Sequence, residues 1–181
     1  QGSDHSGDGS ENDPFATIQH GINNADPNDT VIISDGTYEE SINFYGKAIT
    51  VASRFILDQD PSHIISTIIR PDGGTVVTFS SNEGNDSQLV GLYITGGDNG
   101  IVNAGIYCNE ASPVISNCHI AGNKCEAIKL NLSQAQIINN EIHGWPHFPE
   151  GPCDAITVNR SGPLIQDNII YAGDPNGNIS A

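Results

Sequence analysis

The chain of 181 residues is long enough for one domain with a sizeable hydrophobic core. Its 22 acidic and 6 basic residues give a formal net charge of −16, which repels nucleic acids and anionic membranes and favours cations. No apolar run approaches the roughly 20 residues needed to span a bilayer. Because the sequence begins with Gln1 and contains no methionine, we interpret it as a processed or excised piece without its signal peptide.

Residues 1–13 are acidic and rich in turn-forming residues. Asp4, Ser6 and Asp8 stand at alternate positions before Gly9, as in the first half of a calcium loop. The glutamate expected at the twelfth position of such a loop is absent, because Phe15 stands there. Ca²⁺ is thus the cofactor that the sequence suggests, and a solvated turn is the alternative.

A short amphipathic helix is expected next. Asp13 followed by Pro14 is typical of a helix N-cap and first helical position. Phe15, Ile18 and Ile22 would then share one apolar face. We assign residues 1–30 to an acidic loop and a helix that caps the remaining domain, residues 31–181.

Short apolar runs separated by turn-forming residues predict strands in the next part of the chain. These runs are residues 30–34, 41–44, 48–52, 66–70, 76–80 and 89–95. Residues 54–63 and 96–104 break the pattern, so we predict that both are loops.

Residues 105–170 repeat one pattern three times: GIYCNEASPVISNCHI, AIKLNLSQAQIINNEI and AITVNRSGPLIQDNII. A step of 22 residues separates Ile106 from Ile128, and a step of 28 separates Ile128 from Ile156. The six extra residues of the second step lie in one connection. Three short apolar runs per unit can bury their faces only when units stack. The pattern predicts an all-β parallel solenoid with three strands per turn, roughly six turns and a length of about 30 Å.

The pattern G-I-x-C-x-x-x-S-P-x-I-x-N-C-x-I resembles the repeats of right-handed parallel β-helix proteins of the pectate-lyase-like superfamily. The segment FATIQHGI…DTVIISDGTYEESINFYGKAITV resembles the start of many such domains. This superfamily includes polysaccharide lyases, glycoside hydrolases, pectin esterases, phage tailspikes and non-catalytic surface proteins, so the fold alone does not decide function. The R-x-P-x-x-R of pectate lyases and the paired aspartates and G-H-G of polygalacturonases are absent.

Alternation assigns two faces to the first strand of each unit. The inward positions are Ile106, Cys108, Ile128, Leu130, Ile156 and Val158, and the outward ones are Tyr107, Lys129 and Thr157. Two columns at the bends are predicted to form ladders: Asn109, Asn131 and Asn159, and Cys118, Asn140 and Asn168.

In many family enzymes the substrate lies along the outer face of the first sheet, which the resemblance places at Tyr107 and Lys129. Glu126 and Asp154, stacked at the strand entry, could chelate Ca²⁺. The alternative is a surface lysine that is ion-paired with these carboxylates.

The enlarged connection, residues 143–154, contains Trp145 and Phe148. Exposed rings on a connection can hold the apolar faces of sugars; the alternative is that both rings fold onto the rod. His143, His147 and Cys153 also suggest a metal site, but Pro146 prevents a helical pair of histidines.

We therefore predict an exported or cell-surface β-helix that binds a polysaccharide or other glycan without catalysis. The alternatives are the N-terminal part of a polysaccharide lyase or glycoside hydrolase, and a structural module of a surface layer or fibre. Extension of the register makes Asn178 to Ser180 another first strand, so we expect further turns beyond residue 181, or another chain that covers residues 164–171 and Ile179.

Cys125 and Cys153 occupy equivalent positions on adjacent turns, since each precedes an alanine by two residues. We predict that they form a disulfide, because their Cα atoms should lie about 5 Å apart. The bond would close a loop of 28 residues and stabilise the fold by roughly 3–4 kcal/mol. Sulfur atoms well beyond bonding distance in an oxidised crystal would contradict this prediction. Cys108 and Cys118 are expected to be small buried core groups, and a second bridge between them is the alternative.

Overall fold

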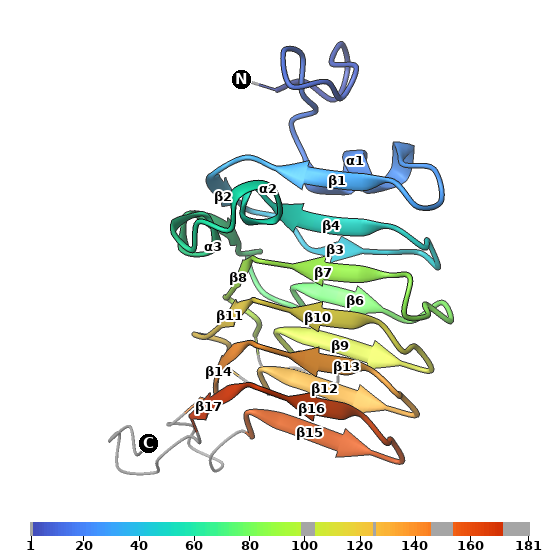
Figure 1. The fold of residues 1–181 in the computed structure, drawn as a ribbon, viewed down its shortest axis with the longest axis vertical. Helices are drawn as coiled ribbons and strands as arrows, with labels where there is room; N and C mark the ends of the chain where they lie inside the picture. Colours follow the sequence, from blue (N-terminus) through green and yellow to red (C-terminus); the bar gives the residue numbers. More distant parts are fainter. Residues whose placement is uncertain (1, 99–103, 125, 146–153, 172–181) are drawn as a thin grey trace.

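The computed structural model describes residues 2–98, 104–124, 126–145 and 154–171. They form a right-handed parallel β-helix with three sheets along its length, as predicted (Figure 1). Sheet A consists of β1 (Thr30–Ile33), β4 (Thr50–Ser53), β7 (Gln88–Val90), β10 (Val114–Ser116), β13 (Gln136–Ile138) and β16 (Leu164–Gln166). Sheet B consists of β2 (Gly36–Tyr38), β5 (Thr67–Ile69), β8 (Tyr93–Ile94), β11 (His119–Ile120), β14 (Glu141–His143) and β17 (Ile169–Tyr171). Sheet C consists of β3 (Ile42–Asn43), β6 (Val77–Phe79), β9 (Ile106–Asn109), β12 (Ile128–Asn131) and β15 (Ile156–Asn159).

The strand register confirms that each sequence repeat is one turn of the solenoid. In sheet C, Ile106 pairs with Ile128, and Ile128 pairs with Ile156. The other repeated isoleucines pair in the same way in sheets A and B. Steps of 22 and 28 residues therefore both advance the chain by one turn of the solenoid.

Two strand predictions differ from the structure. The predicted strand 89–95 is two strands, β7 and β8, because the chain turns at Gly91 with φ +67°. A Cβ atom at Gly91 would lie 2.9 Å from the Phe55 ring, so a side chain does not fit there. Strand β2 was not predicted, because Gly36 suggested a turn rather than the first residue of a strand.

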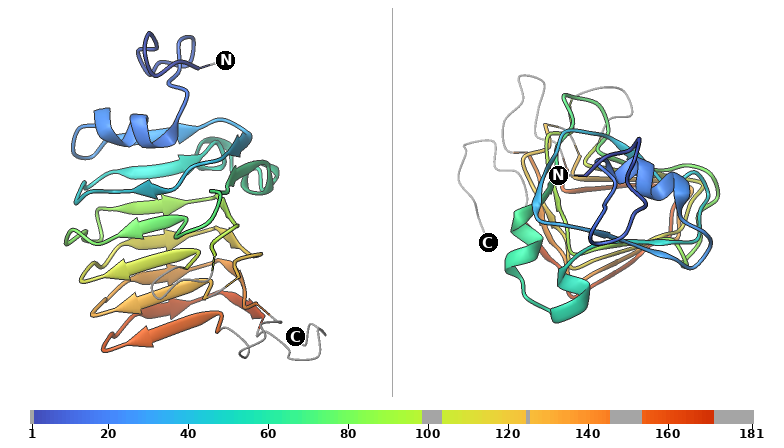
Figure 2. Two further views of the ribbon diagram at one scale, coloured as in Figure 1. Left: turned by 180° about the vertical axis from the view of Figure 1, so that it is seen from behind. Right: turned by 90° about the horizontal axis from the view of Figure 1, so that it is seen from above.

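Residues 54–63 are not an irregular loop. They contribute α2 (Phe55–Asp58) and the beginning of α3 (Ser62–Ser66), two short helices that connect β4 to β5. Seen along the rod, these helices project from its side (Figure 2, right). The His63 ring holds them, because Nδ1 lies 2.7 Å from Asp35 Oδ1 and Nε2 lies 3.3 Å from Asp58 Oδ2.

The capping helix α1 (Ile18–Asn24) is present, but it begins later than predicted. Its N-cap is Thr17 rather than Asp13, because the Thr17 hydroxyl accepts a hydrogen bond from the His20 amide. The Glu40 carboxylate accepts from the amides of the first helical residues, Ile18 and Gln19. Helix α1 lies across the end of the rod (Figure 2), and the side chains of Ile18 and Ile22 are buried in the core.

Amide ladders satisfy the polar groups of the bends. Asn131 donates to Asn109 at 2.6 Å, and Asn159 donates to Asn131 at 2.8 Å, which confirms the first predicted ladder. In the second column the Asn140 side chain accepts from the Cys118 amide and donates to the Ile115 carbonyl. The first ladder links the bends of three consecutive turns, and the contacts of Asn140 in the second column are buried.

Cys108 and Cys118 are buried in the interior, as predicted, and both are free thiols. Burial raises the pKa of both thiols, that of Cys118 to about 12, so they act as small apolar core groups. The two cysteines of the predicted disulfide, Cys125 and Cys153, lie outside the described residues.

The last described turn is less buried than the turns before it. Val158, expected in the interior, has 46% of its surface exposed although it pairs in register with the buried Leu130. The difference follows from position, since no described strand covers the outer side of β15. The predicted strand at Asn178 to Ser180 lies outside the described residues.

The Asn140 contacts lead to a prediction about stability. Asn140→Ala should lower the free energy of unfolding by about 1–3 kcal/mol, because the buried Cys118 amide loses the side-chain oxygen that accepts its hydrogen bond. Asn159→Ala, at an exposed position of the other ladder, should cost less than about 1 kcal/mol. Urea unfolding of both variants measures the difference, and equal costs would contradict this account.

Candidate functional site

A column of polar and aromatic side chains follows the outer face of sheet B. Because Ile120 and Ile142 point into the core, alternation directs His119, Glu141 and His143 outward. The column, which we call the sheet B column, consists of Tyr93, His119, Glu141, His143 and Tyr171.

The rings of the sheet B column contact one another from turn to turn. Tyr93 and His119 meet edge to face with centroids 4.7 Å apart, and His143 stacks on Tyr171 at 4.3 Å. The ring centroids of His119 and His143 lie 5.3 Å apart, and the Glu141 carboxylate contacts a nitrogen of each ring. Its Oε2 lies 3.3 Å from His119 Nδ1, and its Oε1 lies 2.9 Å from His143 Nε2.

These contacts favour the ionised form of the carboxylate. The hydrogen bond from His143 lowers the pKa of Glu141, and the two neighbouring imidazoles act in the same direction. Partial burial opposes the effect but does not cancel it. Glu141 is therefore an ionised hydrogen-bond acceptor at neutral pH.

Helices α2 and α3 form a helical projection from the rod. A groove of about 310 Å³, which we call the sheet B groove, lies between this projection and the sheet B column. One wall is apolar and comes from Phe55, Pro61, Ile64 and Ile65. The opposite wall carries the side chains of Asn117, His119, Asn139 and Glu141 beside the buried Cys118. The groove thus combines an apolar surface with amide, imidazole and carboxylate groups.

The bend residues of the groove have backbone conformations that suit their side chains. Asn117 and Asn139 both have φ +55°, in the left-handed region that asparagine tolerates better than most residues. The Asn139 amide donates a hydrogen bond to the Asn117 side chain one turn away. This contact holds both amides at the mouth of the groove.

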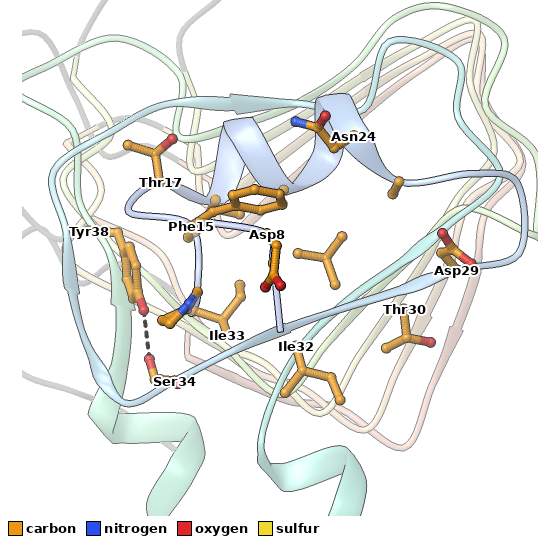
Figure 3. A pocket seen from close by; sticks show the side chains of 16 residues that line it. Asp8, Phe15, Thr17, Asn24, Asp29, Thr30, Ile32, Ile33, Ser34 and Tyr38 are labelled. Carbon is orange, nitrogen blue, oxygen red and sulfur yellow. Dashed lines mark hydrogen bonds between the residues drawn. The ribbon is translucent and has the colours of Figure 1, made fainter. Parts of the chain in front are cut away.

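A larger hollow of about 530 Å³ lies at the N-terminal end of the rod (Figure 3). Asp8, Phe15 and Ile33 are among the residues that line it. Several of its polar groups are engaged locally, since Asp8 accepts from the Ser10 amide, and the Tyr38 hydroxyl donates to the Ser34 carbonyl. This hollow follows from incomplete coverage of the end of the rod by α1.

A third hollow of about 440 Å³ lies along the connections between sheets B and C. Its charged lining residues are Glu39, Arg70, Asp72, Asp98 and Lys124. Arg70 lies 3.7 Å from Glu39, so part of its positive charge is balanced within the protein. We choose the groove beside the sheet B column as the candidate binding site, because it alone among these three hollows combines an apolar wall with imidazole and carboxylate groups.

The site residues predicted on sheet C lie where the register requires. Tyr107, Lys129 and Thr157 form one outward column. Lys129 Nζ lies 3.2 Å from Glu126 Oε1, which is the ion pair considered as the alternative to a calcium site. Asp154, at the equivalent position one turn further, is exposed.

The predicted calcium ligands of the N-terminal loop make hydrogen bonds within the protein. The Asp4 carboxylate accepts from the Ala16 and Thr17 amides and from the Thr17 hydroxyl, which lowers its pKa. Ser6 donates to the Ser3 hydroxyl. Asp4 therefore positions the start of α1, and calcium binding at Asp4, Ser6 and Asp8 stays a prediction.

The predicted sugar platform is described only in part. Trp145 is half-buried and follows β14 by two residues, whereas Phe148 lies outside the described residues. The preceding residue, Gly144, donates its amide to the Tyr171 carbonyl at 2.8 Å. This bond places the beginning of the enlarged connection next to the end of the sheet B column.

The sequence contained a signal for the sheet B column that our prediction did not use. His119 and Glu141 are separated by 22 residues, and His143 and Tyr171 by 28, the two steps of the repeat. Alternation applied to the third strand of each unit would have brought them together. No periodic signal exists for Phe55, Ile64 and Ile65, because they belong to the helical projection.

Comparison with known proteins identifies only the beginning of the chain. Residues 1–45 match the model of a family described as a protein of unknown function (DUF1565), a family associated with β-helix proteins. This match covers the acidic loop, α1 and β1 to β3, and ends before the groove. No curated protein matches the chain.

The anchor of the helical projection should depend on pH. The hydrogen bond with Asp35 raises the pKa of His63 above 6.5, and the charges of Asp35 and Asp58 add to this. Protonated His63 therefore stabilises the fold fully below pH 6.5, and this contribution is lost as the pH rises through the raised pKa. NMR titration should show a lower His63 pKa in Asp35→Asn, and an unchanged pKa would contradict the assignment.

Proposed function

We propose that this domain binds a glycan in the sheet B groove, without catalysing a reaction on it. The observation that carries the proposal is the pairing of an apolar wall at Phe55, Ile64 and Ile65 with polar groups at Asn117, Asn139 and Glu141. A sugar ring has an apolar face and a rim of hydroxyl groups. The two walls of the groove match these two chemistries.

The polar wall can exchange hydrogen bonds of both directions with hydroxyl groups. Glu141 accepts, whereas the amides of Asn117 and Asn139 both donate and accept. The volume of about 310 Å³ lies at the lower end of the roughly 300–1,000 Å³ typical of small-ligand sites. It suits a short segment of a chain better than a large folded ligand.

The net charge of −16 indicates which glycans are favoured. Like charges repel, so a neutral glycan is the preferred ligand, and an anionic polysaccharide would require a bridging cation. Trp145 and Phe148 would extend the binding surface into the enlarged connection, and Tyr107 and Lys129 would offer a second contact on sheet C.

The proposed setting is the cell exterior, as a secreted or surface-attached protein. The predicted Cys125–Cys153 bond supports it, because disulfides persist in oxidising compartments. In the described residues no helix is long and apolar enough to cross a membrane. Exposed Ile165, Ile169 and Ile170 on the last described turn favour a second candidate role, end-to-end contact in a surface layer or fibre.

Two serine variants, Ile65→Ser and Leu57→Ser, test the groove, because the two residues are equally exposed. Ile65 and Leu57 belong to the same helical projection and are both 61% exposed, but only Ile65 lines the groove. Ile65→Ser should weaken retention on an array of neutral polysaccharides several-fold, since it removes apolar contact area. Leu57→Ser should bind as the unmodified protein does.

Affinity electrophoresis measures retention, and thermal melting shows whether either variant has lost stability. Equal retention of both variants, or no retention of the unmodified protein on any glycan, would overturn the proposal. Because both substituted positions are largely exposed, the melting temperature should change little in each variant.

A further inference from the structure

The centre of the sheet B column has the donor atoms of a metal site. His119, Glu141 and His143 each offer one ligand atom, and these three atoms all lie within 4.8 Å of one another. We infer that they bind one divalent transition-metal ion, with Zn²⁺ as the best match. This inference goes beyond glycan binding and does not rest on it.

The distances already approach those of a coordinated ion. Glu141 Oε2 lies 3.3 Å from His119 Nδ1, and Oε1 lies 2.9 Å from His143 Nε2. Around tetrahedral Zn²⁺, with bonds of about 2.0–2.1 Å, neighbouring ligand atoms are separated by roughly 3.3 Å. Side-chain rotation would have to bring the three ligand atoms, now within 4.8 Å of one another, to this separation.

The donor set selects the class of metal. Two imidazoles and one carboxylate suit Zn²⁺, Co²⁺, Ni²⁺ or Cu²⁺, whereas Ca²⁺ takes six to eight oxygen ligands. With three protein ligands, one position of a tetrahedral ion stays open for water or another oxygen donor. The side chains are 23%, 44% and 24% exposed in chain order, so an ion can enter from solvent.

Neighbouring groups hold the ligands in place. His119 and Glu141 are register partners on the paired strands β11 and β14, and His143 lies two residues beyond Glu141 on the same face. The Tyr93 ring contacts His119, and the Tyr171 ring stacks on His143 with an angle of 19° between the planes. These contacts restrict ring rotation and reduce the entropy lost on binding.

The charge of the site supports cation binding. The Glu141 carboxylate lies beside both imidazoles and supplies an oxygen donor for a cation. The chain as a whole has a net charge of −16, which raises the local concentration of cations. In the alternative, the carboxylate only bridges two rings by hydrogen bonds, and no metal binds.

Zinc titration by calorimetry separates the two cases. It uses the complete chain without a histidine tag and with accessible thiols blocked by iodoacetamide, so that neither a tag nor cysteine binds the metal. We expect one Zn²⁺ per chain, with no competition from Ca²⁺. Glu141→Gln, His119→Gln and His143→Gln should each weaken binding at least about tenfold. Co²⁺ should give the visible absorption of a tetrahedral site, and each substitution should remove it.

His63→Gln is the matched control. His63 also lies between two carboxylates, but Asp35 contacts its Nδ1 and Asp58 its Nε2, so no single ring nitrogen faces both. This variant should bind Zn²⁺ as the unmodified protein does, and circular dichroism checks the fold of every variant. If a histidine variant fails to fold, Glu141→Gln still decides, because its amide keeps the shape of the side chain. Absence of Zn²⁺ binding to the unmodified chain, or binding that survives Glu141→Gln, would overturn the inference.

Discussion

Parallel pairing of each strand with its equivalent one turn away is the constraint on which the rest of the structure depends. It places chain positions 22 or 28 residues apart next to one another, at a spacing of about 4.8 Å. Identical residues then stack on identical residues. Inward isoleucines form a continuous apolar core, and asparagines at the bends form ladders that satisfy backbone and side-chain groups. On the outer face the same stacking brings His119 and Glu141 within contact distance, although they lie on different turns.

The groove depends on a segment that departs from the repeat, because stacked turns alone do not form one. A regular turn has flat outer faces, so a groove requires a segment that leaves the rod. Helices α2 and α3 are such a segment, and they stand beside the bends at Asn117 and Asn139. Binding residues are often carried by connections that a rigid scaffold positions, and this groove follows that rule. Its apolar wall comes from the irregular connection, and its polar wall comes from the regular turns.

The sequence predicted the regular part of the fold well because periodicity is a direct consequence of strand stacking. Ile106, Ile128 and Ile156 pair as expected, and the ladder through Asn131 forms as expected. Predictions that relied on local propensity were less accurate. Asp13 and Pro14 have the chemistry of a helix start, yet Thr17 is the N-cap, because Asp4 and Glu40 come from elsewhere in the chain to bind the first amides.

Such long-range contacts leave no local pattern, and the same holds for the groove. The position of Phe55 against the turn at Gly91 depends on how the helical projection folds back onto the rod. The sheet B column is a different case. Its members follow the repeat, but our prediction assigned outward faces only on the first strand of each unit. The distinction is physical, because residues within the sheets inherit their neighbours from the register, whereas residues in connections acquire theirs from tertiary packing.

The alternation of faces also explains how this fold can carry a polar site without a loss of core packing. Ile142 is buried between Glu141 and His143, so the residue that stabilises the core is adjacent in sequence to two residues that face solvent. The outer residues can therefore differ from turn to turn while the inner column stays isoleucine. Contacts across the turns then supply orientation, since Tyr93 and Tyr171 flank the histidines from the turns above and below. The Glu141 carboxylate contacts both imidazoles because the three residues occupy neighbouring outward positions on the adjacent strands β11 and β14. Their side chains face solvent, so they contribute little to the packing that stabilises the rod.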